Sequence, residues 1–386
     1  MWLSDFQVVL PDRVIPKGAV RVRDGVIAEI SETPVAAAGI EGRGMLLLPG
    51  MIDIHGDMIE REVEPRPNVR MPMELGLRDL DRKLASSGVT TAYAALSFSP
   101  GSTYGHLRSF EHTSAMIRAL RKARAGLLVD HRIHARFEVT FPKALDVVSG
   151  LVAEGSVDLI SLCDHTPGQG QYRDLELYTA NLARAKKIEM DEAAVTVAER
   201  ITERTRPAAE MSQVLGAIAR TCRAHGVALA SHDDDTPAKV ALMRDIGAAI
   251  SEFPVTIEAA RAAHAAGMLT VMGAPNALRG LSYSGNLSAR QAHEAGLLDI
   301  LAADYHPSAM LPAVLALAGA DPQGLAGAAR LVSLNPARAL GLKDRGRIAP
   351  GSRADLVAAD PQGVGHVRMT LREGRIVYSD GSLAAT

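Results

Sequence analysis

Short apolar runs alternate with longer helix-period segments between about residues 49 and 342 of this 386-residue chain. This alternation is typical of repeated βαβ units, in which crossover helices join parallel strands. Eight runs have the composition of buried strands, at residues 51–55, 89–95, 133–139, 157–162, 227–231, 248–253, 269–273 and 298–303. Helix-forming residues dominate segments 74–87, 111–125 and 256–266. We therefore expect an α/β fold with a (β/α)8 barrel, with a doubly wound sheet as the alternative.

Both ends of the chain have the sequence pattern of antiparallel β-structure. Residues 8–30 form short alternating runs that are broken by prolines, a glycine and the hairpin signal Asp24-Gly25. Residues 347–359 and 367–378 show the same pattern. Neither end has enough strands to enclose a core of its own. We expect one split β-sandwich domain, made of residues 1–48 and 343–386, beside a barrel of residues 49–342.

Residues 166–223 are too long for an ordinary connection between a strand and a helix. The segment is first rich in glycine and aromatic residues and becomes strongly helical from Ile188 onward. Long excursions after a barrel strand often cover an active site. We expect a helical, lid-like insertion over about 166–223, and a docking helix pair without a catalytic role is the alternative.

The charge balance and the hydropathy pattern exclude several classes of protein. The formal net charge is −2, which argues against a nucleic-acid partner held by a large positive field. Apolar stretches fall short of the roughly 20 residues that cross a bilayer, and the first residues lack a secretory pattern. The only cysteines, Cys163 and Cys222, are too few for a disulfide framework. We expect a cytoplasmic protein without a nucleic-acid or membrane partner.

Histidines and carboxylates recur where the predicted strands end. The carboxyl ends of barrel strands carry the chemistry in this type of fold. Imidazole nitrogen and carboxylate oxygen together suit an ion such as Zn²⁺ or Mn²⁺, and a buried carboxylate is costly unless it is paired or binds a cation. The predicted ligands are His55, Asp57, Glu138, His165, His232 and Asp304. His131 and His134 lie earlier in their strand and are weaker candidates, and His306 stays undecided.

Three stretches resemble the amidohydrolase superfamily: residues 48–55 (LPGMIDIH), 335–342 (NPARALGL) and 351–357 (GSRADLV). The resemblance implies a distorted (β/α)8 barrel of TIM type, a β-sandwich built from both termini, and one or two divalent ions, zinc above all. Stretches 132–138, 162–169, 230–234, 273–276 and 284–286 more narrowly resemble metal-dependent diphosphatases of the carbon-phosphorus lyase pathway. His55-Gly56-Asp57 replaces the usual His-x-His motif, and Glu138 would replace the common carboxylated lysine.

The narrower resemblance implies a reaction. A phosphoanhydride bond of alpha-D-ribose 1-methylphosphonate 5-triphosphate would be hydrolysed, and Asp304 would accept the proton of a metal-activated water. Such a small, anionic, phosphorylated substrate needs cationic and polar partners. The candidates are Arg66, Arg279, Asn276, Ser284 and Asn286, with Arg136 as a weaker one. The alternatives are a C–N hydrolase, such as an N-acetyl sugar-phosphate deacetylase or a cyclic amidase, and a metal-free scaffold. A homo-oligomer stays open.

Overall fold

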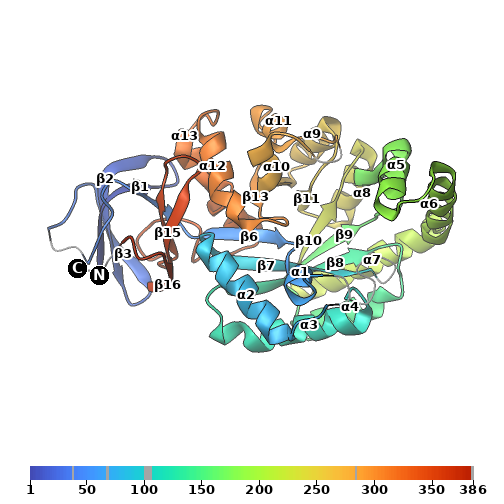
Figure 1. The fold of residues 1–386 in the computed structure, drawn as a ribbon, viewed down its shortest axis with the longest axis horizontal. Coiled ribbons are helices and arrows are strands. Elements are labelled where there is room, and N and C mark those ends of the chain that lie inside the picture. Colours follow the sequence, from blue (N-terminus) through green and yellow to red (C-terminus); the bar gives the residue numbers. More distant parts are fainter. Residues whose placement is uncertain (37–38, 67–68, 100–106, 283–284, 384–386) are drawn as a thin grey trace.

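Eight parallel strands form the centre of the molecule in the computed structural model, which describes residues 1–36, 39–66, 69–99, 107–282 and 285–383. The strands pair in chain order and lie at the centre of the ribbon in Figure 1. They are β6 (Met51–Gly56), β7 (Val89–Phe98), β8 (Asp130–Glu138), β9 (Leu159–Cys163), β10 (Ala228–His232), β11 (Ile250–Glu252), β12 (Leu269–Gly273) and β13 (Ile300–Ala302). Each predicted strand run overlaps one of them. The α/β barrel expected from the sequence is therefore confirmed.

The barrel closes between its first and last strands. The main-chain N–H of Asp304 donates to the carbonyl of His55 at 2.9 Å, and that of Asp57 donates to the carbonyl of Asp304 at 2.7 Å. Strand β11 ends at Glu252 because Phe253 adopts a left-handed φ of 54°. Burial on both faces explains why the strands read as continuous apolar runs in the sequence.

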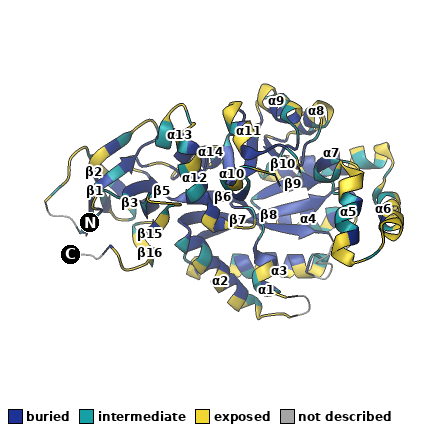
Figure 2. Ribbon diagram, turned by 45° about the horizontal axis from the view of Figure 1, so that its top comes forward, coloured by how far each residue is buried: buried dark blue, intermediate teal, exposed yellow. Residues whose placement is uncertain are grey.

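Helices surround the barrel and turn their apolar faces toward it, so that buried strands lie inside partly exposed helices (Figure 2). Segments 74–87, 111–125 and 256–266 are helical, as expected. Side chains of Ser109, Thr236 and Thr256 accept main-chain N–H groups at the starts of the helices that begin at 110, 237 and 257. Around the barrel lie α1 (Ile59–Val63), α2 (Met73–Ser86), α3 (Phe110–Ala123), η1 (Arg124–Gly126), α4 (Ala144–Ala153), α8 (Pro237–Ile246), α9 (Ile257–Ala265), α10 (Ala274–Arg279), α11 (Ala289–Glu294), η3 (Pro307–Ala309), α12 (Met310–Ala318), α13 (Gly324–Arg330) and α14 (Leu334–Ala339).

The two termini build one mixed sheet beside the barrel. Its strands are β1 (Trp2–Val9), β2 (Val14–Arg23), β3 (Val26–Ser31), β4 (Ile40–Glu41), β5 (Leu46–Pro49), β14 (Leu356–Asp360), β15 (His366–Arg372) and β16 (Arg375–Ser379). Antiparallel pairing of β5 with β14 joins the N-terminal and C-terminal parts. The sheet encloses a core to which both terminal parts of the chain contribute. The Ile27 N–H donates to the Ser352 carbonyl at 2.8 Å and so ties β3 to the segment before β14. The domain limits at 48/49 and 342/343 stay a prediction.

The segment 166–223 divides into two parts. Its first part holds η2 (Gly170–Tyr172), α5 (Leu175–Lys186) and α6 (Met190–Arg204), which lie at the end of the molecule opposite the terminal sheet (Figure 1). Its second part is α7 (Ala208–His225), which buries Leu215, Ile218 and Cys222 in the barrel core. Helix α7 thus packs on the barrel as part of its outer ring, and the lid-like insertion over about 166–223 stays a prediction. None of the described helices is long and apolar enough to cross a membrane.

Candidate metal centre

Most of the predicted ligands meet at the carboxyl ends of the barrel strands. His55, Asp57, His232 and Asp304 line a cavity of about 480 Å³ together with Arg136. Glu138 and His165 lie next to it, around a smaller hollow that also touches Arg136. The six residues come from β6, β8, β10 and the loops after β6, β9 and β13, so the barrel geometry alone brings them together.

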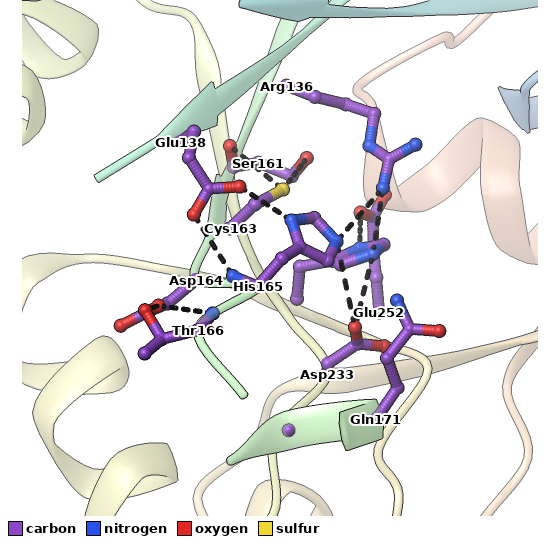
Figure 3. A network of polar contacts seen from close by, with 12 residues as sticks. Arg136, Glu138, Ser161, Cys163, Asp164, His165, Thr166, Gln171, Asp233 and Glu252 are labelled. Carbon is purple, nitrogen blue, oxygen red and sulfur yellow. Dashed lines mark hydrogen bonds and ion pairs between the residues drawn. The ribbon is translucent and has the colours of Figure 1, made fainter. Parts of the chain in front are cut away.

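His165 is held by the carboxylate of Glu138, as Figure 3 shows. Its Nδ1 lies 2.6 Å from Glu138 Oε2, and its main-chain N–H donates to Glu138 Oε1 at 3.0 Å. Thr140 donates to the same Oε1 at 3.2 Å. Both carboxylate oxygens of Glu138 therefore already accept hydrogen bonds, and this geometry makes Glu138 a support for His165.

Glu252 has the same position behind two other histidines. Its Oε2 lies 3.3 Å from Nδ1 of His55 and 3.2 Å from Nδ1 of His232. The two imidazole rings stack with centroids 5.4 Å apart, and Phe253 packs edge-on against both. Burial raises the pKa of the Glu252 carboxyl. One carboxylate thus orients two predicted ligands from different strands.

His55 and His232 are neutral at pH 7. Burial lowers the pKa of His55 to about 3 and holds the pKa of His232 well below its usual value. A neutral imidazole carries one N–H, and the Nδ1 atoms of His55, His165 and His232 all face carboxylates. With the proton on Nδ1, the lone pair of each imidazole lies on Nε2. This is the arrangement of histidines that bind metal ions, with a carboxylate behind each imidazole.

Donor atoms for a divalent ion converge beside the cavity. The ligand atoms of His165, His232 and Asp233 all lie within 4.8 Å of one another. Oδ2 of Asp233 is buried without a hydrogen-bond partner, and burial raises the pKa of this carboxyl to about 6. A cation would satisfy this oxygen and the two imidazole lone pairs together. The residues present therefore fit a divalent metal ion.

The guanidinium of Arg136 lies among these donor atoms (Figure 3). It contacts Nε2 of His232 at 3.2 Å and Nε2 of His165 at 3.5 Å, and it donates to Asp57 at 3.3 Å. Burial disfavours its charge, but Asp57 outweighs this effect and the pKa of Arg136 is raised. A metal ion on both Nε2 atoms would meet this positive charge directly. We therefore expect the Arg136 side chain to move aside when the ion binds.

Asp304 has the electrostatics of a proton acceptor. Burial, reinforced by the charge of Asp57, raises the pKa of Asp304 to about 7. Its backbone has a left-handed φ of 55° and is fixed by the two hydrogen bonds that close the barrel. A carboxyl whose pKa lies near neutrality can take up and release a proton at pH 7. The role of proton acceptor that the family resemblance implies for Asp304 stays a prediction.

Comparisons with known proteins place this chain in a family. The profile of the amidohydrolase family matches residues 323–378. Over 392 aligned positions the chain is 36% identical to alpha-D-ribose 1-methylphosphonate 5-triphosphate diphosphatase of Escherichia coli K12, covering 98% of this chain and 100% of the relative. The chain belongs to the amidohydrolase superfamily.

Solved structures of the superfamily share the fold of this amidohydrolase. N-acetyl-D-glucosamine-6-phosphate deacetylase of Mycobacterium smegmatis matches with a TM-score of 0.66 at 17% identity, over 98% of this chain and 100% of that one. Dihydropyrimidinase of Brevibacillus agri matches with a TM-score of 0.57 at 15% identity, over 100% of this chain and 96% of that one. Identities this low extend the likeness to the fold alone.

Three of the five predicted substrate-binding residues of the amidohydrolase line the cavity: Asn276, Arg279 and Asn286. Asn286 donates to the Gln171 carbonyl at 3.4 Å, which links the cavity wall to the inserted segment. Ser284 lies outside the described residues. Arg66 is exposed beside its bridge partner Val69 and is not among the described residues that line the cavity.

Sequence reasoning missed three residues that the amidohydrolase brings to the site: Asp233, Glu252 and Arg61. Glu252 ends strand β11 and lies within the sixth predicted strand run, 248–253, so the rule that singled out residues at the other strand ends applies to it as well. Asp233 lies in the run of three aspartates after His232. Arg61 lies in α1 and lines the cavity where Arg66 was expected. His134, the weaker candidate, bonds the Ile54 carbonyl and Ser161 and so has both ring nitrogens occupied.

Proposed function

We propose that this amidohydrolase is a divalent-metal-dependent diphosphatase. It hydrolyses a phosphoanhydride bond of alpha-D-ribose 1-methylphosphonate 5-triphosphate and releases pyrophosphate and alpha-D-ribose 1-methylphosphonate 5-phosphate. The full-length relative supports the substrate class. The observation that carries the proposal is one cavity that is lined both by metal-type donors and by the guanidinium groups of Arg61 and Arg279. Such a cavity suits a polyphosphate chain.

The metal would be held by His55, His165 and His232 with carboxylates of Asp57, Asp233 or Asp304. We propose zinc, with manganese as the alternative, because the donor set mixes imidazole and carboxylate. When bound, the ion would supply a water of lowered pKa and an electrophilic partner for a phosphoryl oxygen. Glu138 and Glu252 orient the imidazoles from behind.

The other steps fall to the chain itself. Asp304 accepts the proton of the attacking water and returns it to the leaving pyrophosphate, for which its pKa of about 7 is suited. Arg279 and Arg61 bind the phosphates that are not attacked. Asn276, whose Oδ1 accepts the Ala289 N–H at 2.9 Å, presents a fixed amide to the cavity.

We also propose a domain division, a location and a partner class for the whole chain. Residues 1–48 and 343–386 form one β-domain, residues 49–342 form the hydrolase barrel, and the protein works in the cytoplasm. The substrate is a small phosphorylated molecule, and neither nucleic acid nor membrane is a partner.

The test identifies which bond the protein hydrolyses by measuring the products that are released. The protein, loaded separately with Zn²⁺, Mn²⁺ and Mg²⁺, is incubated with the ribosyl methylphosphonate triphosphate while pyrophosphate release is followed. Parallel reactions measure acetate from N-acetylglucosamine 6-phosphate and ammonia from a cyclic amide. We expect pyrophosphate only, and a strongly reduced rate in Asp304→Asn. Release of acetate or ammonia without pyrophosphate under every metal would replace the proposal with C–N hydrolysis.

A further inference from the structure

A second, positively charged hollow lies between the barrel and the terminal sheet. It has a volume of about 460 Å³, and we call it the arginine groove. Its lining comes from α3, η1, the start of β8, the segment before β14, the end of β15 and the turn that follows β15. The lining residues are Arg121, Arg124, Ala125, Asp130, Arg132, Arg345, Arg353, Arg372 and Glu373. A volume of this size falls within the usual range of about 300–1,000 Å³ for small-ligand sites.

The arginine groove is distinct from the metal centre. Asp130 and Arg132 lie at the beginning of β8, whereas Glu138 ends the same strand beside the predicted ligands. At about 3.3 Å per residue, the strand separates Arg132 from Glu138 by roughly 20 Å. A ligand in the arginine groove therefore cannot touch the metal ligands.

Positive charge dominates the groove wall. Six arginines line it against two carboxylates, Asp130 and Glu373. The buried carboxylate of Asp130 is shared by three of them: Arg124 at 2.6 Å, Arg345 at 2.7 Å and Arg132 at 3.4 Å. Three further carboxylates outside the lining are paired with these arginines: Asp158, Asp344 and Asp355. The six guanidinium groups therefore still outnumber the five carboxylates that lie in or next to the groove.

Arg372 carries the unmatched charge. Its Nη1 donates to the carbonyls of Leu127 at 3.0 Å and Leu128 at 3.2 Å, and no ion pair joins it to a described carboxylate. The neighbouring Arg353 faces Glu373 at 3.0 Å and Asp355 at 3.3 Å. Arg121 has only a 3.7 Å contact with Asp158. Guanidinium groups arranged around a hollow repel one another unless an anion lies between them.

We propose that the arginine groove binds a small polyanion with two or more phosphoryl groups. Planar guanidinium groups donate paired hydrogen bonds to phosphoryl oxygens, and several converge here from different elements. Arg121, Arg124 and Arg132 belong to the barrel side, whereas Arg353 and Arg372 belong to the terminal part of the chain. A bound polyanion therefore bridges the barrel and the terminal sheet and stabilises their contact. This inference does not depend on the reaction at the metal centre.

The test titrates inorganic pyrophosphate into the full-length protein at low ionic strength by isothermal titration calorimetry. Ala125 is exposed and lines the groove, so Ala125→Glu adds a negative charge there without removing a hydrogen bond. Lys122→Gln, in α3 but outside the lining, makes the same change of one charge unit and is the matched control. All variants are compared at equal metal content.

We expect Ala125→Glu to weaken the binding of pyrophosphate in the arginine groove by at least about tenfold, because the new carboxylate lies beside the anion and has the same sign of charge. Lys122→Gln should keep its affinity within about twofold. Arg279→Gln, on the cavity wall of the metal centre, should leave this binding unchanged. Pyrophosphate should also raise the thermal unfolding midpoint of the wild type and of Lys122→Gln more than that of Ala125→Glu.

Two results would overturn the proposal. One is equal pyrophosphate binding by Ala125→Glu and Lys122→Gln. The other is complete loss of binding in Arg279→Gln, which would locate all pyrophosphate at the metal centre. Arg372→Gln provides a second variant, expected to lose at least about tenfold in affinity. If Arg372→Gln fails to fold, as judged by circular dichroism, the comparison between Ala125→Glu and Lys122→Gln decides alone.

Discussion

Glu138 binds His165 twice, once through the ring and once through the main chain. Nδ1 of His165 lies 2.6 Å from Oε2, and the His165 N–H donates to Oε1 at 3.0 Å. Burial alone would raise the pKa of Glu138, but the contact with His165 outweighs it and the pKa is lowered. An ionised carboxylate therefore fixes both the tautomer of His165 and the loop that carries it.

Glu138→Gln should weaken metal binding by about 10–100-fold, the usual cost of losing a partner behind a ligand. The reason is that the amide no longer attracts the Nδ1 proton, so the Nε2 lone pair is less well directed. Competition with a chromophoric chelator measures the affinity. Thr140→Val, which removes the other hydrogen bond to Glu138, is the control and should change little. A loss far beyond 100-fold would instead make Glu138 a direct ligand.

His232→Ala should abolish tight metal binding, because Nε2 of His232 belongs to the group of converging donor atoms. His225→Ala is the matched control, since His225 is exposed at the end of α7. Metal content after dialysis, measured by mass spectrometry, should be stoichiometric in the control and negligible in His232→Ala. Retention of metal by His232→Ala would show that the donor set is assigned to the wrong residues.

Asp304→Asn should lower kcat by about 10²–10⁴-fold, the usual contribution of a general base. In the wild type we expect kcat to rise with pH through the pKa of Asp304, about 7 without metal, because only the carboxylate accepts a proton. The rise should flatten in the variant. A pH–rate profile checks both points, and an unchanged slope in Asp304→Asn would assign the titration to another group.

Arg279→Gln should raise KM for the triphosphate substrate by about tenfold or more, because it removes a charge-assisted hydrogen bond. Arg66→Gln serves as the comparison, since Arg66 is exposed and is not among the described residues that line the cavity. Its KM should stay within about twofold. Steady-state kinetics of both variants measure the difference, and the reverse order would restore Arg66 as the phosphate partner.

Asp53→Asn should become more stable relative to the wild type as pH rises from 4 to 7. Burial raises the pKa of Asp53 to about 7, so the folded wild type holds a proton that the unfolded chain loses near pH 4. Stability from this group is therefore present below pH 4 and is lost as pH rises to 7. The asparagine amide stays neutral, and its oxygen can accept the His55 and Ala303 N–H groups.

Urea unfolding of the metal-free proteins at several pH values measures the free energy of unfolding. The buried histidines titrate in both proteins, so their effect cancels in the difference. Asp245→Asn, at an exposed carboxylate, should show no such trend. A constant difference between Asp53→Asn and the wild type would mean that Asp53 is ionised throughout.

The barrel could be predicted because each strand carries its own signal. Strands buried on both faces give short apolar runs, and helices of a different period separate them. The role of α7 could not be predicted in the same way. Its sequence is as helical as that of α6, and only its packing on the barrel core shows that it belongs to the ring.

The site was harder to predict where a residue's role depends on contacts with residues that are distant in the sequence. His55 and His232 end apolar runs and stand out in the sequence, whereas Glu252 gains its meaning from lying within 3.3 Å of both. Arg61 and Arg66 are close in the chain and chemically identical. The short helix α1 brings Arg61 to the cavity, and the chain then leaves the cavity wall before Arg66.

The hydrogen bonds that close the barrel can form only after its last strand has been synthesised. Ala303 N–H donates to the side-chain Oδ1 of Asp53 across 250 residues, next to the pairing of Asp304 with His55 and Asp57. A chain still on the ribosome carries the first histidines long before Asp304 has been synthesised. Until then β6 and β12 are unpaired sheet edges, which are open to association with other chains. We therefore expect metal loading to follow release of the finished polypeptide, and C-terminal truncations before β13 to aggregate.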